Sequence, residues 1–350
     1  MTTLFDELKI GSMKLKNCTF MAPMSLGYGD QTGIPTLQEQ AYWLERAKGE
    51  VGCIITDATS VDPNTPYLGN TLCFRSEESI VEYKKFTDKI HEYGTKIIPQ
   101  ITHPGPESIS SFFGVTPISS SGYLNSMYQQ TRELKVEEIP NIISMYANTS
   151  YQAKQAGFDG IELHCAHGYM LLGSFLSPLK NKRTDEYGGS FENRYRFAVE
   201  IVKEIKKVCG QDFPVSLRYS VESKTKGFRE GALPGESFTE AGRDMAESEK
   251  AAKYLQDAGY DMLNCDNGTY DAWYWAHPPI YMPENCNLED VAHIRKFVDI
   301  PVVCAGRMDP ETAAAAIADG QIDGAGFARQ FLADQEWVLS LIHISEPTRH

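Results

Sequence analysis

The sequence predicts an α/β protein with the fold of a (β/α)8, or TIM, barrel. Short apolar segments rich in β-branched residues recur along the whole chain, and amphipathic segments alternate with them. No linker or shift in composition divides the 350 residues. Strands that alternate with helices favour a parallel sheet, and eight such units can close into a barrel. The predicted strands cover residues 18–24, 51–57, 96–101, 159–164, 214–219, 261–265, 301–305 and 324–328.

The segments between these strands have the apolar spacing of amphipathic helices. A doubly wound open sheet is the alternative fold, but it would normally carry a glycine-rich turn after its first strand. Here that turn reads Met21-Ala22-Pro23-Met24-Ser25. The predicted helices cover residues 37–48, 79–93, 136–156, 192–208, 239–258, 288–297 and 310–318, and capping glycines follow five of them, Gly94, Gly157, Gly210, Gly259 and Gly320.

We expect one domain over residues 1–338 and a non-native tail over residues 339–350. Residues 339–349 read Leu-Ser-Leu-Ile-His-Ile-Ser-Glu-Pro-Thr-Arg, which resembles the translation of a sequencing-library adapter. A natural tail with the same residues is the alternative. A non-native tail would truncate the eighth helix, which we expect to begin near Leu332 and to run past Trp337. Residues 104–135, rich in Ser and Gly, predict an excursion over the barrel mouth.

Composition limits the partners of the chain. Hydrophobic residues make up 42% and charged residues 23%, which suits a large core. The net charge of −14 argues against nucleic acid or an anionic membrane as the main partner. No apolar run approaches a membrane span and the N-terminus lacks signal-peptide features, so we expect a cytoplasmic protein, and an oligomer is compatible with the sequence. The eight cysteines form no Cys-x-x-Cys pair, which disfavours a zinc or iron–sulfur site in this chain.

The most informative motif follows the fourth predicted strand. His164, His167 and Tyr169 stand within six residues. Two imidazoles and a phenol can hold a substrate oxygen and deliver a proton. Structural packing is one alternative for these side chains. A metal pair is the other, but it would need further ligands, and Cys165 should point to the opposite side of the extended segment from His164.

Other predicted strands also end in polar residues. Gln100 ends the third strand, with His103 nearby, and Arg218 lies within the fifth. An arginine inside a barrel is costly unless it faces an anion or a carboxylate such as Glu162.

The loops after the seventh and eighth strands each combine a small residue with an arginine at a helix start. These residues are Gly306 and Arg307, then Ala328 and Arg329. Barrel enzymes often bind phosphate at these two loops. A pair of surface arginines at ordinary helix starts is the alternative.

Together, these motifs resemble the old yellow enzyme family of FMN-dependent ene-reductases, also called NADH:flavin oxidoreductases. The likeness is to the bacterial branch with 2,4-dienoyl-CoA reductase, enoate reductase and the bile-acid-inducible NADH:flavin oxidoreductases. It covers residues 4 to about 337. The motifs, in the family's order, are Phe20-Met21-Ala22-Pro23-Met24, Ile97-Ile98-Pro99-Gln100, His164-Cys165-Ala166-His167-Gly168-Tyr169, Phe175-Leu176-Ser177-Pro178, residues 183–189, Glu192-Asn193-Arg194, Ala305-Gly306-Arg307 and Ala328-Arg329.

The resemblance implies that FMN lies across the barrel mouth. The backbone at Pro23 and Met24 would pack on the flavin, Ser25 would hydrogen-bond its O4 edge, and Ser60 would line its edge. The remaining contacts implied are Gln100 at the pyrimidine edge, Arg218 near N1, and Gly306, Arg307, Ala328 and Arg329 at the phosphate.

The resemblance also implies a reaction. His164 and His167 would bind the carbonyl oxygen of an enone, enoate or enoyl-CoA, steroid or bile-acid-like compounds included. Hydride would pass between the flavin and the β-carbon, and Tyr169 would protonate the α-carbon, since a phenol stays protonated at neutral pH. NADH or NADPH would supply the electrons, no metal is implied, and the reverse desaturation is equally compatible. Residues 183–189 and 192–194 are expected to form a salt-bridged loop and a helix start without chemistry.

Two departures from the family leave alternatives open. His103-Pro104-Gly105-Pro106-Glu107 stands where many relatives carry His-x-Gly-Arg, so the role of that arginine is unassigned. Large members of the branch continue with a 4Fe–4S cluster and a domain for FAD and NAD(P)H, which this chain could carry only in a missing C-terminal part. The second hypothesis is therefore a flavin-binding electron-transfer half, inactive alone. The third is a metal-dependent barrel hydrolase, which would usually need a His-x-His pair where Pro23-Met24-Ser25 stands.

Overall fold

The computed structural model of the chain describes residues 4–345 and contains a closed parallel barrel. The sheet closes because β3 pairs with both β4 and β15, with Phe20 opposite Cys53 on one side and Gly326 on the other. The predicted barrel is confirmed, and the open doubly wound sheet is excluded. The barrel strands are β3 (Thr19–Met21), β4 (Cys53–Ser60), β6 (Lys96–Thr102), β9 (Ile161–His164), β10 (Val215–Ser220), β13 (Met262–Asp266), β14 (Val302–Ala305) and β15 (Gly324–Phe327).

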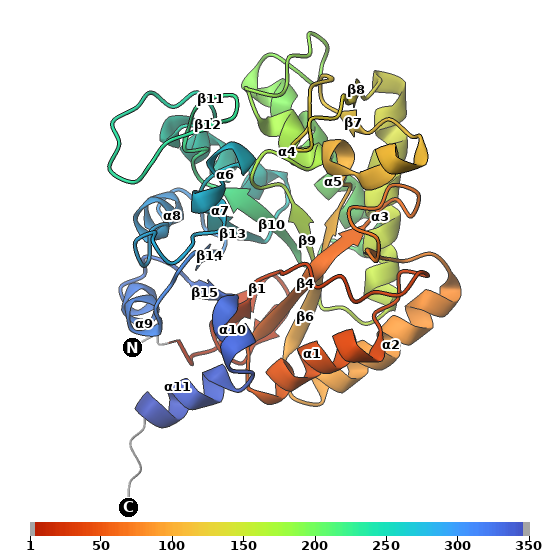
Figure 1. Cartoon of the computed structure of the whole chain (residues 1–350). Coiled ribbons are helices and arrows are strands. Elements are labelled where there is room, and N and C mark those ends of the chain that lie inside the picture. Colours follow the sequence, from red (N-terminus) through yellow and green to blue (C-terminus); the bar gives the residue numbers. More distant parts are fainter. Residues whose placement is uncertain (1–3, 346–350) are drawn as a thin grey trace, which may run out of the picture.

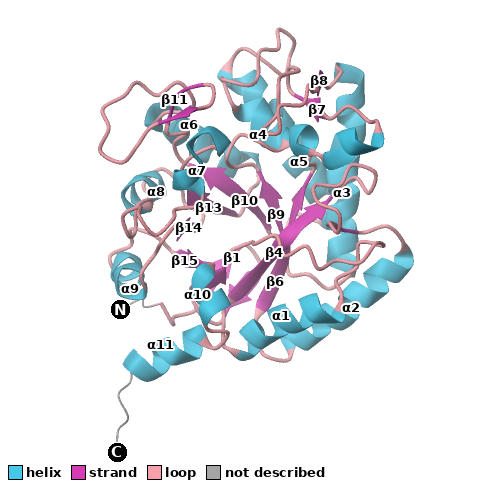
Figure 2. Cartoon of the chain, in the orientation of Figure 1, coloured by secondary structure: helices cyan, strands magenta, loops and turns pink. Residues whose placement is uncertain are grey.

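Helices surround the strands, as Figure 1 and Figure 2 show. Their apolar faces pack inward at helical spacing. In α5, for example, Tyr195, Ala198, Val202 and Ile205 are all buried. The helices of the ring are α1 (Leu37–Lys48), α2 (Glu77–His91), α3 (Ile139–Gln155), α5 (Phe191–Cys209), α6 (Met245–Ala258), α8 (Leu288–Arg295), α9 (Pro310–Ala318) and, at the C-terminal end, α10 (Arg329–Ala333) with α11 (Trp337–Ser345).

A hairpin of β1 (Leu8–Ile10) and β2 (Met13–Leu15) closes the N-terminal end of the barrel. Its apolar side chains form a separate core cluster with residues that the barrel strands point inward, among them Phe20, Ile55 and Ile98. Because this end is filled, the opposite end, where the strands terminate, is left to form a site. The remaining short elements are β5 (Leu72–Cys73), β7 (Ile118–Ser119), β8 (Arg132–Glu133), β11 (Thr225–Gly227), β12 (Glu230–Gly231), α4 (Leu171–Leu176), α7 (Trp273–Ala276) and the 3-10 turns η1 (Gly105–Glu107), η2 (Ile109–Phe113), η3 (Val136–Glu138) and η4 (Tyr270–Ala272).

Two predicted helices differ markedly from those in the structure. The helix expected over residues 239–258 begins only at Met245, because Asp244 adopts extended backbone and its side chain caps the helix through the N–H of Glu247.

The expected eighth helix is divided between α10 and α11. The carboxylate of Asp334 accepts the N–H of Glu336 at 2.9 Å and the hydroxyl of Ser340 at 2.8 Å, which holds the break between them. Of the expected tail, residues 346–350 lie outside the described residues, and its non-native origin stays a prediction. No helix within residues 4–345 is long and apolar enough to cross a membrane.

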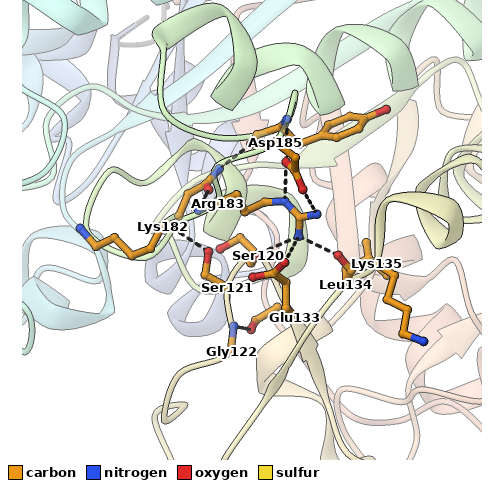
Figure 3. Close-up of polar contacts among 12 residues, drawn as sticks. Ser120, Ser121, Gly122, Glu133, Leu134, Lys135, Lys182, Arg183 and Asp185 are labelled. Atoms are coloured by element: carbon orange, nitrogen blue, oxygen red, sulfur yellow. Dashed lines mark hydrogen bonds and ion pairs between the residues drawn. The ribbon is translucent and has the colours of Figure 1, made fainter.

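The excursion at residues 104–135, here called the rim segment, packs beside α4 at the side of the barrel mouth. Figure 3 shows how the predicted salt-bridged loop holds it in place. The guanidinium of Arg183 binds the carboxylate of Asp185 and donates to the carbonyl oxygens of Ser120 at 2.9 Å and Leu134 at 2.6 Å. The loop therefore has the structural role expected of it, because its arginine binds both Asp185 and the rim segment.

Candidate active site

A cavity of about 840 Å³ opens at the C-terminal ends of the barrel strands. This volume lies within the range of small-molecule and cofactor sites, roughly 300–1,000 Å³. Nearly all of the residues predicted for the site line it, from six different strand ends and their loops. They are Pro23, Met24, Ser25, Gln100, His164, His167, Tyr169, Arg218, Gly306, Arg307, Ala328 and Arg329.

Ser60 is the predicted residue that the structure does not bring to this cavity. It is buried at the end of β4, and its hydroxyl donates to the carbonyl oxygen of Asp62 at 2.8 Å. The same hydroxyl accepts the N–H of Asp62, so the turn that leaves the strand uses it fully. Ala58, two residues earlier, lines the cavity from this strand.

The two histidines are each held through one ring nitrogen. His164 Nε2 lies 2.7 Å from the hydroxyl of Tyr169, and His167 Nε2 lies 2.8 Å from Oδ2 of Asp266. The Nδ1 atoms of both rings are buried and have no hydrogen-bond partner among the described residues. Two unpartnered imidazole nitrogens on one cavity wall indicate a place for an oxygen atom that the protein itself does not supply.

The local backbone explains how three side chains of one short loop reach the same cavity. His167 has φ +63° and Gly168 has φ +60°, so two consecutive residues adopt left-handed conformations. The N–H of His167 donates to the hydroxyl of Ser220 at 2.8 Å, which fixes this bend. The chain thereby turns back on itself, and Tyr169 packs with its ring centroid 5.2 Å from that of His164.

Burial sets the protonation of these groups. Desolvation, with the nearby charges of His167 and Arg218, lowers the pKa of His164 well below its usual value, so its imidazole is neutral. Desolvation raises the pKa of Tyr169 above that of an exposed phenol, so its hydroxyl is protonated at neutral pH.

Arg218 has a different partner from the one considered in the sequence. Its guanidinium donates to Oδ2 of Asp266 and, at 2.8 Å, to Oδ1 of Asn264. Burial alone would raise the pKa of Asp266, but the charges of Arg218 and His167 outweigh it and lower that pKa. Asp266 therefore stays ionised and ties Arg218 to His167.

Glu162, the carboxylate considered as a partner of Arg218 in the sequence, accepts hydrogen bonds from neutral donors instead. It accepts from the amides of Gln100 and Asn264, each at 2.8 Å, and from the hydroxyl of Ser216 at 3.1 Å. Its burial raises the pKa of its carboxyl despite the charge of Arg218. The carboxylate thus orients the Gln100 amide at the cavity wall.

An aromatic wall from the loop after β13 was missed in the sequence. The ring of Tyr270 stacks on that of Tyr169, with centroids 3.6 Å apart and planes 9° apart, and Trp273 stacks on His277 at 4.1 Å. All four rings line the cavity, as does Tyr67 from the loop after β4. Two features of the sequence could have indicated this wall: the many aromatic residues from 270 to 277, and the polar residues at the end of β13.

The opposite end of the cavity carries two arginines. Arg307 follows Gly306 in a left-handed conformation with φ +49°, and its Nε is buried with no hydrogen-bond partner in the part of the chain that the structure describes. Its terminal nitrogen lies 3.3 Å from a carboxylate oxygen of the exposed Glu284, while Arg329 donates to the carbonyl oxygen of Pro278. Arginines at the starts of two helices, beside small residues, suit a phosphate.

The described residues contain no group of three or more His, Cys, Asp or Glu side chains that could hold a metal ion. Cys165 belongs to the hydrophobic core outside the cavity lining, and burial raises the pKa of its thiol to about 12. The expected placement of Cys165 away from the cavity wall is confirmed.

Comparison with known proteins agrees with this geometry. A family model described as the NADH:flavin oxidoreductase / NADH oxidase family matches residues 3–344. The chain belongs to this family. The family resemblance stated from the motifs is therefore confirmed.

Relatives of this chain differ in length. The chain is 42% identical to cinnamate reductase of Clostridium sporogenes, in an alignment that covers 95% of the chain and 51% of the cinnamate reductase. It is 32% identical to NADPH dehydrogenase of Bacillus subtilis over 95% of its length and 91% of that protein. The chain thus spans about half the length of relatives such as the cinnamate reductase.

Solved structures of the family share the barrel. A 2-naphthoyl-CoA reductase complexed with 2-naphthoyl-CoA has a TM-score of 0.88 and 26% identity, over 97% of this chain and 52% of that one. An old yellow enzyme homologue from Zymomonas mobilis has a TM-score of 0.82 and 26% identity, over 99% and 94% of the two chains.

Proposed function

We propose that the chain is an FMN-dependent oxidoreductase that transfers hydride to or from a C=C bond conjugated to a carbonyl group, with NADH or NADPH as the electron source. One observation carries the proposal. Within residues 4–345, both imidazole Nδ1 atoms in the cavity lack a hydrogen-bond partner, while both Nε2 atoms are held by protein groups. Such a pair suits a carbonyl oxygen.

The residues of the cavity fit FMN. The buried, unpartnered Nε of Arg307 calls for an acceptor, and a phosphate at the ends of β14 and β15 would supply one. Gln100 and Arg218 would hold the edge of the ring system, with Pro23, Met24 and Ser25 beside it. When bound, FMN supplies the chemistry of hydride transfer between a nicotinamide and a carbon of the substrate.

The two histidines would bind the carbonyl oxygen through their Nδ1 atoms. Nε2 of His167 is held by Asp266, so this ring would meet the carbonyl oxygen through Nδ1. His164 is neutral, so its Nδ1 carries the proton if Nε2 accepts the hydroxyl of Tyr169. Donation from both rings would draw electrons from the conjugated bond.

Tyr169 would then act as the acid that protonates the α-carbon. It lines the cavity beside both histidines, and its raised pKa keeps the proton in place until a carbanion-like centre forms.

The aromatic wall favours a planar substrate. Tyr270 and Trp273 offer ring faces and edges to a conjugated aryl group, and similar proteins are a cinnamate reductase and a 2-naphthoyl-CoA reductase. We therefore propose an aryl enoate or its thioester ahead of a steroid or bile-acid-like compound.

Half-reaction kinetics test the proposal. The purified chain should show the absorption of FMN, and in stopped-flow experiments NADH or NADPH should reduce it and an enone should reoxidise it. Replacing Tyr169 by Phe should slow reoxidation by about a hundredfold or more and leave the reduction by nicotinamide nearly unchanged. A colourless protein, or an equal loss in both half-reactions, contradicts the assignment. Tyr274→Phe, in the same aromatic loop but outside the cavity lining, is the control.

A second candidate is an electron-transfer half that works only with further domains. The half-length coverage of cinnamate reductase favours it. Turnover of an enone with NADH or NADPH by this chain alone would decide for the first candidate.

A further inference from the structure

Tyr169 must regain a proton after each turnover, yet it lies deep in the protein. Its side chain is 5% exposed. The neighbouring His164 is neutral and would hold the substrate, while His167 is held by Asp266. Neither imidazole is therefore free to return a proton while product occupies the cavity.

Two further phenols lead from Tyr169 toward the surface. Tyr270 stacks on Tyr169 with ring centroids 3.6 Å apart and ring planes 9° apart, so the two phenols lie side by side. The hydroxyl of Tyr270 lies 3.1 Å from that of Tyr67. Tyr67 is half-buried and precedes the exposed residues 68–70. The three hydroxyls therefore form a chain from the buried acid to the solvent side.

Both outer phenols are held by backbone contacts. The N–H of Tyr270 donates to the carbonyl oxygen of His167 at 3.1 Å, which ties the aromatic loop to the histidine motif. The carbonyl oxygen of Pro66, next to Tyr67, accepts the hydroxyl of Ser108 and the N–H of Ile109, each at 3.1 Å. The rim segment thus fixes the loop that carries Tyr67.

We infer that Tyr270 and Tyr67 return a proton from solvent to Tyr169, an inference that rests on the proposed function. When the Tyr169 O–H bond breaks and the α-carbon gains the proton, a phenolate remains. Tyr270 gives its hydroxyl proton to that phenolate, Tyr67 gives its proton to Tyr270, and a solvent proton restores Tyr67. One proton is taken from water for each proton placed on carbon, and the three phenols end as they began.

Burial differs between the two ends of the chain of phenols. Tyr169 is 5% exposed, whereas Tyr67 is half-buried and precedes exposed residues. A phenolate is therefore costly at Tyr169 and less costly near solvent at Tyr67. Transfer of a proton from Tyr67 toward Tyr169 is therefore favourable, because it moves the negative charge from the buried phenol to the phenol near solvent.

Single-turnover and steady-state kinetics separate this role from packing. The FMN-loaded chain is reduced with dithionite, mixed with 2-cyclohexenone for one turnover, and compared with continuous turnover on NADH or NADPH. In Tyr270→Phe the first turnover should stay within about twofold of the unmodified chain, because Tyr169 starts protonated. Continuous turnover should fall about tenfold or more and recover when imidazolium buffer is added as a small proton donor. Tyr67→Phe should behave alike, while Tyr274→Phe should show neither effect.

A first turnover slowed as much as later ones, or turnover that imidazolium does not restore, overturns the relay. So does unchanged continuous turnover in both variants. Failure of the unmodified chain to reduce any enone would instead defeat the proposed function, so the two failures are distinguishable. Tyr67→Phe, at the less buried end of the chain of phenols, keeps the test open if Tyr270→Phe does not fold.

Discussion

Replacing Asp266 by Asn should destabilise the protein and weaken the pair of histidines that we propose to bind a carbonyl oxygen. The carboxylate is 1% exposed, and its Oδ2 accepts from both His167 Nε2 and the guanidinium of Arg218. Asparagine keeps the shape but removes the charge. A hydrogen bond to a charged group contributes about 1.5–3 kcal/mol, and two of them are weakened here. Removing one partner of a buried ion pair costs about 3–5 kcal/mol. The estimate from the hydrogen bonds and the estimate from the ion pair therefore agree on the expected loss in the free energy of unfolding.

Urea unfolding of the FMN-saturated protein measures this loss. The midpoint should fall with little change in the slope, since the surface exposed on unfolding is the same. Asp257→Asn is the control, because Asp257 pairs with Lys253 on the surface, where an ion pair contributes at most about 1 kcal/mol. A loss below about 1 kcal/mol in Asp266→Asn would refute the buried-pair reasoning.

The same variant should also weaken substrate binding. Without the carboxylate, the hydrogen bond that orients His167 through Nε2 is weakened, and the ring is held less firmly for contact with the carbonyl oxygen through Nδ1. KM for an enone should rise about tenfold or more, the equivalent of one lost hydrogen bond to a charged group. The rate at which NADH or NADPH reduces the flavin is the internal comparison. This rate should change less than KM for the enone.

Three further predictions concern stability. Burial raises the pKa of Glu39 to about 9 and that of the neighbouring Asp57 to about 7, so the folded chain keeps protons that the unfolded chain releases, and stability should fall as pH rises through this window. Each carboxyl adds at most about 1.4 kcal/mol per pH unit to the slope, and Glu39→Gln should reduce the slope in unfolding curves taken from pH 5 to 9. Arg183→Leu should cost about 3 kcal/mol or more by leaving the carbonyl oxygens of the rim segment unpaired, and limited proteolysis should then cut that segment. Gly105→Ala should lower the thermal midpoint, because Gly105 has φ +56° and a Cβ there would lie 2.7 Å from Cα of Leu171; an unchanged midpoint would contradict the contact.

Much of the fold and part of the site follow from the sequence alone. The alternation of strand and helix is a local property, because side chains repeat every two residues along a strand and about every 3.6 along a helix. Parallel strands share one carboxyl edge, so Gln100, His164, Arg218 and Arg307 were expected at the same end of the barrel, and they line one cavity.

Other features depend on which loops fold against one another. Asp266 meets His167 across 99 residues, and Tyr67 meets Tyr270 across 203. No local pattern encodes such contacts, because they arise only when the loops after different strands gather at the barrel mouth. Ser60 shows the converse, since its strand position suggested the cavity but its hydroxyl is taken up by the turn that follows. The sequence alone determined the barrel and singled out His164, His167 and Tyr169, because side-chain periodicity and the order of strands are local properties of the chain. Only the tertiary structure decided which partners contact these three side chains, because a hydrogen bond depends on the distance between two atoms in space.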